Sequence, residues 1–388
     1  MTHIPGESAS DLLLRLVEID SRNPSITAGS PGEEPLATFV ADWLTAAGIP
    51  AEVIPAVDGR PNVLGVLPGT IGTTVIFEAH LDTVPGGPAI RINGRRLSAR
   101  GACDAKGSLA AMMVAAARIA TKDGPHPTVV VAGVCDEEYI MRGAVALADR
   151  LPPADLLVVG EPTSLVPARA HNGFIRFEAT VIGRSAHSSR AELGVNAIEK
   201  AGQLLTQLEA TLIAERRDHP GHELAGKALL SATLITGGLA PNIVPDRCTI
   251  TFDRRVSPGE DPNVVLAEIQ AAIRGYAAEI DVEVELPAPF VSLRGFETPA
   301  SSVGVSAVER AASAVLGRAV EAIGVTYSTD ACAFQVRDDL PCVVFGPGSI
   351  DQAHTDDEWV DLDEVNLAAD IFERVALELT VSEERTAE

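Results

Sequence analysis

The sequence has few cysteines, and their spacing shows no pattern typical of a structural site. The 388-residue chain contains five, an odd number, and no two of them have CxxC spacing. This argues against a disulfide framework and against a zinc site made of thiolates. The amino-terminal stretch MTHIPGESASDLLLRL also lacks the basic segment and apolar run of a secretory signal peptide. We therefore expect a reducing, cytoplasmic setting.

Long apolar runs and positive charge are scarce as well. The most apolar helical stretch, 109–117, stops at Arg118 and is too short to span a bilayer. Lys and Arg number 30 against 54 Asp and Glu, which gives a formal net charge of −24. Such a chain is repelled by nucleic-acid phosphates and by anionic lipid surfaces. We expect neither nucleic acid nor a membrane as a partner, and a well-solvated surface.

Several common functional motifs are absent. No GxGxxG follows a strand-like run, and no GxxxxGK[ST] loop is present to bind the phosphates of a nucleotide. The chain has no GxSxG elbow for a serine nucleophile, and the segment GRSAHSS does not supply one. Cys103 and Cys135 stand beside acidic residues, where buried packing is a more common role than nucleophilic attack.

The length of the chain predicts two or three domains. The pattern of the first part of the chain is typical of an α/β fold. Short, almost continuous apolar runs at 73–77, 128–134 and 155–159 are typical of strands covered on both faces by helices. The segments 11–19, 33–47 and 106–120 have helical patterns. This alternation predicts a mostly parallel sheet.

The middle of the chain has a different pattern. We expect strands at 174–182, 229–235, 249–255 and 279–286, the last strictly alternating, and helices at 196–214 and 262–275. The α/β pattern returns near Ser302 with helices at 303–316, 330–337 and 363–379 and a strand at 342–345. The simplest account is a catalytic α/β domain formed by 1–170 and 289–388, interrupted by an inserted α+β domain at 171–288.

A set of histidines and acids follows the predicted strands, where open parallel sheets bind ligands. Imidazole and carboxylate groups suit zinc, cobalt or manganese, and two His with three acids are enough for two metals that share one carboxylate. Each motif alone is more often an ordinary loop or surface feature, but their joint placement predicts a two-metal centre. The five candidate ligands are His80, Asp104, Glu138, Glu161 and His354.

Two further acids are candidates for supporting roles. Asp82 stands two residues after His80, and we expect its carboxylate to bond the imidazole and fix its tautomer. Glu137 and Glu138 are adjacent and do not easily point the same way, so one is predicted to bind metal and the other to move protons.

The chain resembles a two-zinc exopeptidase and deacylase family that includes acetylornithine deacetylase, succinyl-diaminopimelate desuccinylase, aminoacylase and glutamate carboxypeptidase. The resemblance covers nearly the whole chain. It rests on EAHLDTVP, ARGACDAKGSLAAM, VCDEEYIMRGA, VVGEPT and GPGSIDQAHTDDEWV. It implies a zinc-exopeptidase-like catalytic domain with two metal ions, Asp104 as the bridging ligand and Glu137 as the general base. It further implies that His80 and Glu161 serve one metal, and that Glu138 and His354 serve the other.

The resemblance also implies roles for the inserted domain, as a lid and as the dimerisation surface of a homodimer. GRSAHSSRAELGVNAI is similar to the family's lid segment, which implies that His187 reaches the active site of the partner chain. GGLAPNIVPDRC and FDRRVSPGE imply Asn242 and Arg255 as substrate-binding residues, with Arg255 favoured over Arg254 by the pattern Asp-x-Arg. An Arg fork suits a substrate carboxylate.

HNGFIRF, GPGSIDQAH and TYSTDACAF look closest to acetylornithine deacetylases. Asp330 stands where that group carries an acidic residue, often Glu, and its shorter side chain leaves recognition of a substrate amine open. We expect hydrolysis of the amide bond of N-acyl amino acids. The alternatives are a dipeptidase or carboxypeptidase acting on short peptides, a desuccinylase, an enzyme that removes carbamoyl or other acyl groups, and a non-catalytic metal-binding homologue.

Overall fold

The computed structural model describes residues 6–337 and 340–386, and the chain forms two compact units. The first combines the residues up to Arg169, Glu297–Ile323 and the residues from Thr329 onward; the second consists of Ala170–Phe296 and Gly324–Ser328. The second unit extends past the expected boundary at 288 because β15 (Val291–Leu293) pairs with β9 (Gly173–Ile182), the central strand of its sheet.

The first unit is organised around a sheet in which β1-β2-β6-β3-β7-β18 are successive neighbours, and further strands continue the sheet beyond β18. Strands β6, β3, β7 and β18 are parallel neighbours, whereas β1 and β2 add antiparallel strands at one side. This confirms the expected α/β class with a mostly parallel sheet, whose strands end together at one edge. The strand bounds are Ala51–Val57 (β1), Arg60–Leu67 (β2), Thr74–His80 (β3), Thr128–Val134 (β6), Leu156–Val159 (β7) and Cys342–Val344 (β18).

Alternate side chains of β3 face opposite sides of this sheet. Val75, Phe77 and Ala79 belong to the larger apolar core. Phe77 meets Phe372 edge-on at 5.1 Å between ring centroids. The helices of this core are α1 (Ala9–Val17), α2 (Glu34–Ala46), α3 (Lys106–Ala120), α9 (Val303–Leu316) and α11 (Leu362–Thr386), while α5 (Arg142–Ala148) and α10 (Ala331–Phe334) pack elsewhere on the unit.

A small antiparallel sheet in the same unit joins distant segments. Its order is β19 (Trp359–Asp361), β5 (Arg96–Ser98) and β4 (Arg91–Asn93), and Trp359 pairs with Ser98. The β4–β5 turn is the hairpin expected at Asn93-Gly94. Among the described residues, no helix has both the length and the apolar composition needed to cross a membrane.

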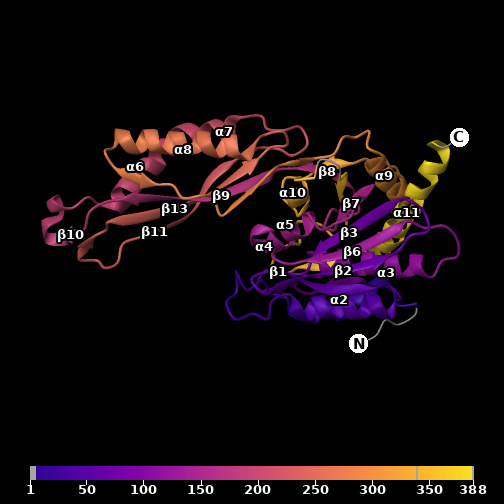
Figure 1. Cartoon of the computed structure of the whole chain (residues 1–388). Helices are drawn as coiled ribbons and strands as arrows, with labels where there is room; N and C mark the ends of the chain where they lie inside the picture. Colours follow the sequence, from indigo (N-terminus) through magenta and orange to yellow (C-terminus); the bar gives the residue numbers. More distant parts are fainter. Residues whose placement is uncertain (1–5, 338–339, 387–388) are drawn as a thin grey trace. The chain divides into compact units, whose positions relative to one another are not determined.

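The second unit is an antiparallel sheet with helices on one face (Figure 1). Strand order is β11 (Leu230–Gly237), β13 (Arg247–Val256), β9 and β14 (Glu283–Glu285). Helices α6 (Ala197–Leu208) and α8 (Pro262–Glu279) bury its core, which contains Phe177 and Phe252 in a stacked pair at 5.2 Å. A π-helical turn, Glu209–Ile213, continues α6 into α7 (Ala214–Asp218).

Two sequence predictions of secondary structure were wrong. The segment 279–286 was expected to be one strand, but α8 continues to Glu279 and only Glu283–Glu285 pair with β9. Helix α8 persists because Val265, Ile269, Ile273 and Ala277 repeat every four residues along its buried side. The helix expected at 330–337 is a single turn, Ala331–Phe334, in the structure.

Candidate metal centre

The five candidate metal ligands lie on different elements of the first unit, at or beyond the carboxyl ends of its parallel strands. His80 is the last residue of β3, and Asp104 precedes α3 by two residues. Glu138 lies in the short helix α4 (Glu137–Ile140) that follows β6, Glu161 follows β7, and His354 lies in the loop after β18. The shared sheet edge therefore gathers residues that are up to 274 positions apart in sequence.

The Asp104 carboxylate lies between two imidazoles. Its Oδ1 is 2.9 Å from His80 Nε2, and its Oδ2 is 3.3 Å from His354 Nε2. Glu161 Oε1 lies 3.9 Å from His80 Nε2, whereas Glu138 Oε2 lies 2.8 Å from His354 Nε2. This arrangement could give each of two metal ions one imidazole and one acid, with the Asp104 carboxylate shared between them.

The donor set fits divalent cations. One donor atom from each of His80, Asp104 and Glu138 can be chosen so that all three lie within 4.8 Å of one another. The Oε1 atom of Glu138 is buried and has no hydrogen-bond partner among the described residues. Imidazole and carboxylate ligands without thiolate match zinc, manganese or cobalt.

Negative charge is concentrated at this centre. Burial raises the pKa of Glu137 and of Glu161 well above the usual range, and neighbouring carboxylates add to the effect. Burial also opposes ionisation of Asp104, but the imidazoles of His354 and His80 lower its pKa below the usual range. The bond to Asp104, together with a second carboxylate, raises the pKa of His354 to about 10. Bound divalent cations would neutralise the negative charge of these carboxylates, which in the absence of metal is neutralised by protons.

The predicted contact between the Asp82 carboxylate and the His80 imidazole is not present. The Nδ1 atom of His80 instead bonds the backbone carbonyl oxygen of Asp82 at 2.9 Å, and the nearer carboxylate oxygen lies 3.9 Å away. The tautomer is still fixed, because a carbonyl oxygen only accepts and so Nδ1 carries the proton. Nε2, which faces Asp104, is thereby the nitrogen that a metal ion would take.

The Asp82 carboxylate has a different role, which is to hold the turn that carries Glu137 and Glu138. It accepts hydrogen bonds from the backbone N–H groups of Glu137 at 3.0 Å and Glu138 at 3.1 Å. The Nδ2 amide of Asn23 donates to the same carboxylate at 2.7 Å. Asp136 enters the turn in the left-handed region with φ of 69°. Asn23, on a segment without a motif, was missed by sequence reasoning.

The comparisons with known proteins agree with this geometry. Residues 76–378 match peptidase family M20/M25/M40. The chain belongs to this family. An acetylornithine deacetylase of Vibrio cholerae serotype O1 is 30% identical over 369 residues, covering 92% of this chain and 94% of that protein. The predicted family resemblance and the prediction of metal-dependent amide hydrolysis are thus confirmed.

Solved structures of the M20 family share the fold. A metallo-carboxypeptidase from Sulfolobus solfataricus superposes with a TM-score of 0.77 at 17% identity, covering 95% of this chain and 98% of that one. A dinuclear metal-binding peptidase of the family from Bacillus subtilis superposes with a TM-score of 0.70 at 17% identity, covering 96% and 97%.

A second pair of buried acids lies in the same unit of this M20 enzyme, and sequence reasoning singled out Asp330 but missed Glu78. Glu78 of β3 and Asp330 before α10 are almost fully buried, and apart from each other's carboxyl group no donor among the described residues bonds their carboxylate oxygens. Burial raises the pKa of each, and for Asp330 the charge of Glu78 contributes further. The signal for Glu78 was present in TVIFEAH, where one acid interrupts an apolar strand.

The three candidate substrate residues lie in the second unit. His187 is in β10 (Ala186–His187), which pairs with β12 (Ile243–Val244), and the Ser188 N–H donates to the Asn242 carbonyl oxygen at 3.0 Å. His187 and Asn242, which lies in the turn before β12, are therefore neighbours, and both are exposed. Arg255 is partly exposed, and its Nη1 donates to Ser328 Oγ at 3.0 Å.

Arg254 and Arg255 lie on opposite faces of β13. Alternate residues of β13 face the core, and Arg254 is one of them, fully buried and paired with Glu260 at 3.0 Å. Arg255 points to the opposite face of the sheet, so it is the arginine of the pair that a ligand can reach.

We expect substitution of the candidate ligands to weaken metal binding. Asp104→Asn should lower the zinc affinity of both sites of the metal-free protein by more than about 100-fold, because one shared charge is lost. His354→Ala should weaken one site only. Calorimetric titration with Zn²⁺ measures both effects. The exposed Asp357→Asn, three residues from His354, is the control. Zinc binding by Asp104→Asn equal to that of the unaltered chain would contradict the assignment.

Proposed function

We propose that this M20 enzyme removes the acyl group from N-acyl amino acids at a centre of two divalent metals, most readily zinc, with cobalt or manganese as alternatives. The observation that carries the proposal is the Asp104 carboxylate between the imidazoles of His80 and His354. Its curated relatives at 30% identity are acetylornithine deacetylases, which favours an N-acetylated amino acid as substrate. Metals bound there would lower the pKa of water and polarise the acyl carbonyl.

Glu137 is the proposed general base. Its backbone N–H bonds Asp82, and its carboxyl group lies within the electrostatic influence of His80, Glu138 and Asp104. In the proposed reaction Glu137 takes a proton from the attacking water, the oxygen bonds the acyl carbon, and the C–N bond breaks. Glu137 then returns the proton to the leaving nitrogen, so that a free amino acid and a carboxylic acid are formed, and the acid ionises to a carboxylate at neutral pH.

Three residues of the second unit are proposed to bind the substrate. The Arg255 guanidinium and the Asn242 side chain would hold the substrate carboxylate, for which a planar fork of N–H donors is well suited. His187 of a second copy of the chain would donate a hydrogen bond to the oxyanion that forms on the acyl carbonyl. The exposure of His187 and its position beside Asn242 support a role in contacts outside its own unit.

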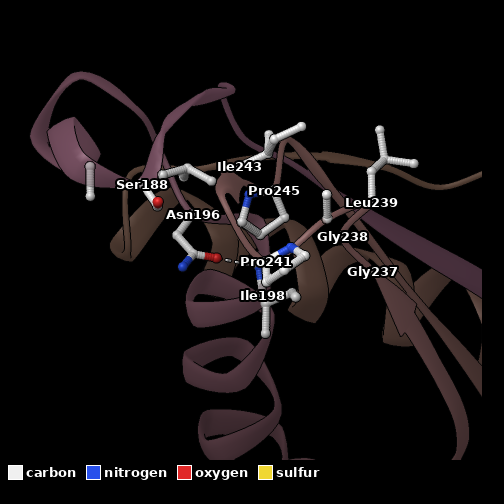
Figure 2. Close-up of a pocket in the computed structure, with 12 residues that line it drawn as sticks. Ser188, Asn196, Ile198, Gly237, Gly238, Leu239, Pro241, Ile243 and Pro245 are labelled. Atoms are coloured by element: carbon white, nitrogen blue, oxygen red, sulfur yellow. Dashed lines mark hydrogen bonds between the residues drawn. The ribbon is translucent and has the colours of Figure 1, made fainter.

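If His187 acts in the active site of a second chain, the protein is a homodimer that associates through the second unit. The exposed apolar surface of that unit supports this. Strand β11 is an edge strand on which only Leu230 is buried, and it exposes Leu234 and Ile235. Beside it is a pocket of about 570 Å³ where Leu239, 89% exposed, projects outward (Figure 2). Monomeric proteins rarely leave an apolar sheet edge uncovered.

A reducing, cytoplasmic setting remains part of the proposal. All five cysteines are buried free thiols. A chain that matures in an oxidising compartment more often uses its cysteines in pairs.

Replacement of the base separates its role from that of the ligands. Glu137→Gln should lower kcat by about 10²–10⁴-fold, because the amide cannot accept the proton. Zinc affinity should remain within a few-fold of that of the unaltered chain, since Glu137 is not a proposed ligand. Steady-state kinetics and calorimetry measure the two quantities. Unchanged hydrolysis by Glu137→Gln would overturn the mechanism.

A substrate panel tests the function itself. Protein reconstituted with Zn²⁺, Co²⁺ or Mn²⁺ should hydrolyse N-acetyl amino acids, N-acetylornithine among them, with a kcat/KM at least about tenfold above that for dipeptides, which is 1.4 kcal/mol of transition-state discrimination. N-succinyl and N-carbamoyl amino acids belong in the same panel. A preference for dipeptides, or no hydrolysis of any member, would refute the deacetylase proposal.

The oligomeric state has its own test. Light scattering should give twice the 40.5 kDa of one chain. Leu234→Asp should shift the mass toward the monomer and lower activity with it, because a charge on the sheet edge opposes pairing. Val264→Asp, on the exposed side of α8, should change neither. A fully active monomer of the unaltered chain would contradict a contribution of His187 across the dimer.

A further inference from the structure

A buried carboxylate outside the ligand set holds the backbone of the bridging residue. Glu358 is 0% exposed, and its Oε1 accepts hydrogen bonds from the backbone N–H groups of Cys103 at 3.0 Å and Asp104 at 3.2 Å. Its Oε2 pairs with Arg100 Nη1 at 2.5 Å. Both oxygens of Glu358 are therefore engaged, one by the peptide segment that ends at Asp104 and the other by a guanidinium.

The Arg100 guanidinium extends this contact to two other loops. Its Nη2 donates to the carbonyl oxygen of Thr355 at 3.1 Å, directly after His354. Weaker bonds reach the carbonyl oxygens of Pro85 and Gly86 at 3.4 Å, in the loop that follows His80 and Asp82. A planar fork of five N–H donors suits such a junction, whereas a lysine ammonium does not span it.

The backbone around Arg100 is shaped to admit this side chain. Gly87 adopts φ of 95°, and a Cβ atom there would lie 2.9 Å from Arg100 Cβ and 3.0 Å from its Nε. The small antiparallel sheet brings Arg100 and Glu358 together. Strand β5 ends at Ser98, two residues before Arg100, and β19 begins at Trp359, directly after Glu358. Ser98 and Trp359 are paired, so backbone hydrogen bonds hold the two segments side by side.

The ligand that most needs such support is His354. Its side chain is 54% exposed and its backbone has φ of 60°, so neither burial nor a favoured conformation holds it in place. Its Nε2 must nevertheless stay within reach of an Asp104 oxygen 250 residues earlier in the chain. The Arg100–Glu358 pair bonds the residue after His354 and the backbone N–H of Asp104 at the same time.

We propose that Arg100 and Glu358 are positioning residues of the metal centre, which set the separation of Asp104 and His354 and thereby the affinity for divalent metal. The proposal rests on the two-metal function above. A displacement of the Thr355 or Cys103 backbone by about 1 Å would be enough to misplace a ligand, since coordination distances tolerate only a few tenths of an ångström. The competing account is an ion pair that stabilises the fold without influence on the metals.

The test is a Zn²⁺ titration of the metal-free protein, followed by calorimetry, on Glu358→Gln, Arg100→Gln and Arg100→Lys. Glu358→Gln keeps an acceptor for the two N–H groups but removes the charge that Arg100 requires. We expect zinc affinity to fall by about 10–100-fold in Glu358→Gln and Arg100→Gln, as is usual when the support of a ligand is lost. Arg100→Lys should give an intermediate loss, because it keeps the charge without the fork.

Glu7→Gln is the matched control. Glu7 has a 3% exposed side chain, pairs with Arg15 at 2.7 Å and accepts from Trp43 Nε1 at 2.9 Å, near the carboxyl-terminal half of α3. It should lower the unfolding midpoint of the metal-free protein about as much as Glu358→Gln does, yet leave zinc affinity unchanged.

The outcomes are distinguishable. If the unaltered chain binds no zinc, the two-metal function fails. If it binds zinc and both glutamine variants bind as tightly, the positioning role alone is refuted. Should circular dichroism show that Glu358→Gln is unfolded, Arg100→Gln and Arg100→Lys, at a residue whose side chain is 12% exposed, decide the question.

Discussion

The contact of one carboxylate with two imidazoles is the constraint on which the first unit depends. Asp104 lies between His80 and His354, and its two oxygens point to different histidines. The three residues come from the end of a strand, the turn before a helix and a loop. They converge because parallel strands end at a common edge of the sheet. The helices of the apolar core cover this sheet and hold its strands in place.

Around this contact, acids that bind no metal in the proposed scheme hold the backbone. Asp82 accepts the N–H groups of Glu137 and Glu138, and Glu358 accepts those of Cys103 and Asp104. A hydrogen bond to a charged carboxylate is stronger than one between neutral groups. A centre with so many like charges would be expected to expand, and these bonds resist that expansion at the turns that carry the ligands.

The two units divide the chemistry between them. The proposed metal ligands and Glu137 lie in the first, whereas the proposed substrate residues His187, Asn242 and Arg255 lie in the second. Division of this kind lets substrate specificity change through the second unit while the hydrolytic groups stay the same. The buried acids Glu78 and Asp330 belong to the first unit, so they are a local property of the catalytic fold.

The sequence by itself determined the parallel strands, the family and the five ligand candidates, because apolar runs followed by His, Asp or Glu are local signals. It did not determine which atoms of Asp82 meet His80, or the pairing of the buried acid Glu78 with Asp330. Nor did it determine the contact of Arg100 with Glu358, which is 258 residues away. The alternating polar and apolar residues of 279–286 also predicted a strand that is too long, because the buried side of α8 keeps the chain helical up to Glu279. Those features were decided by tertiary structure, since side-chain contacts and the packing of a helix on a sheet leave no periodicity in the chain.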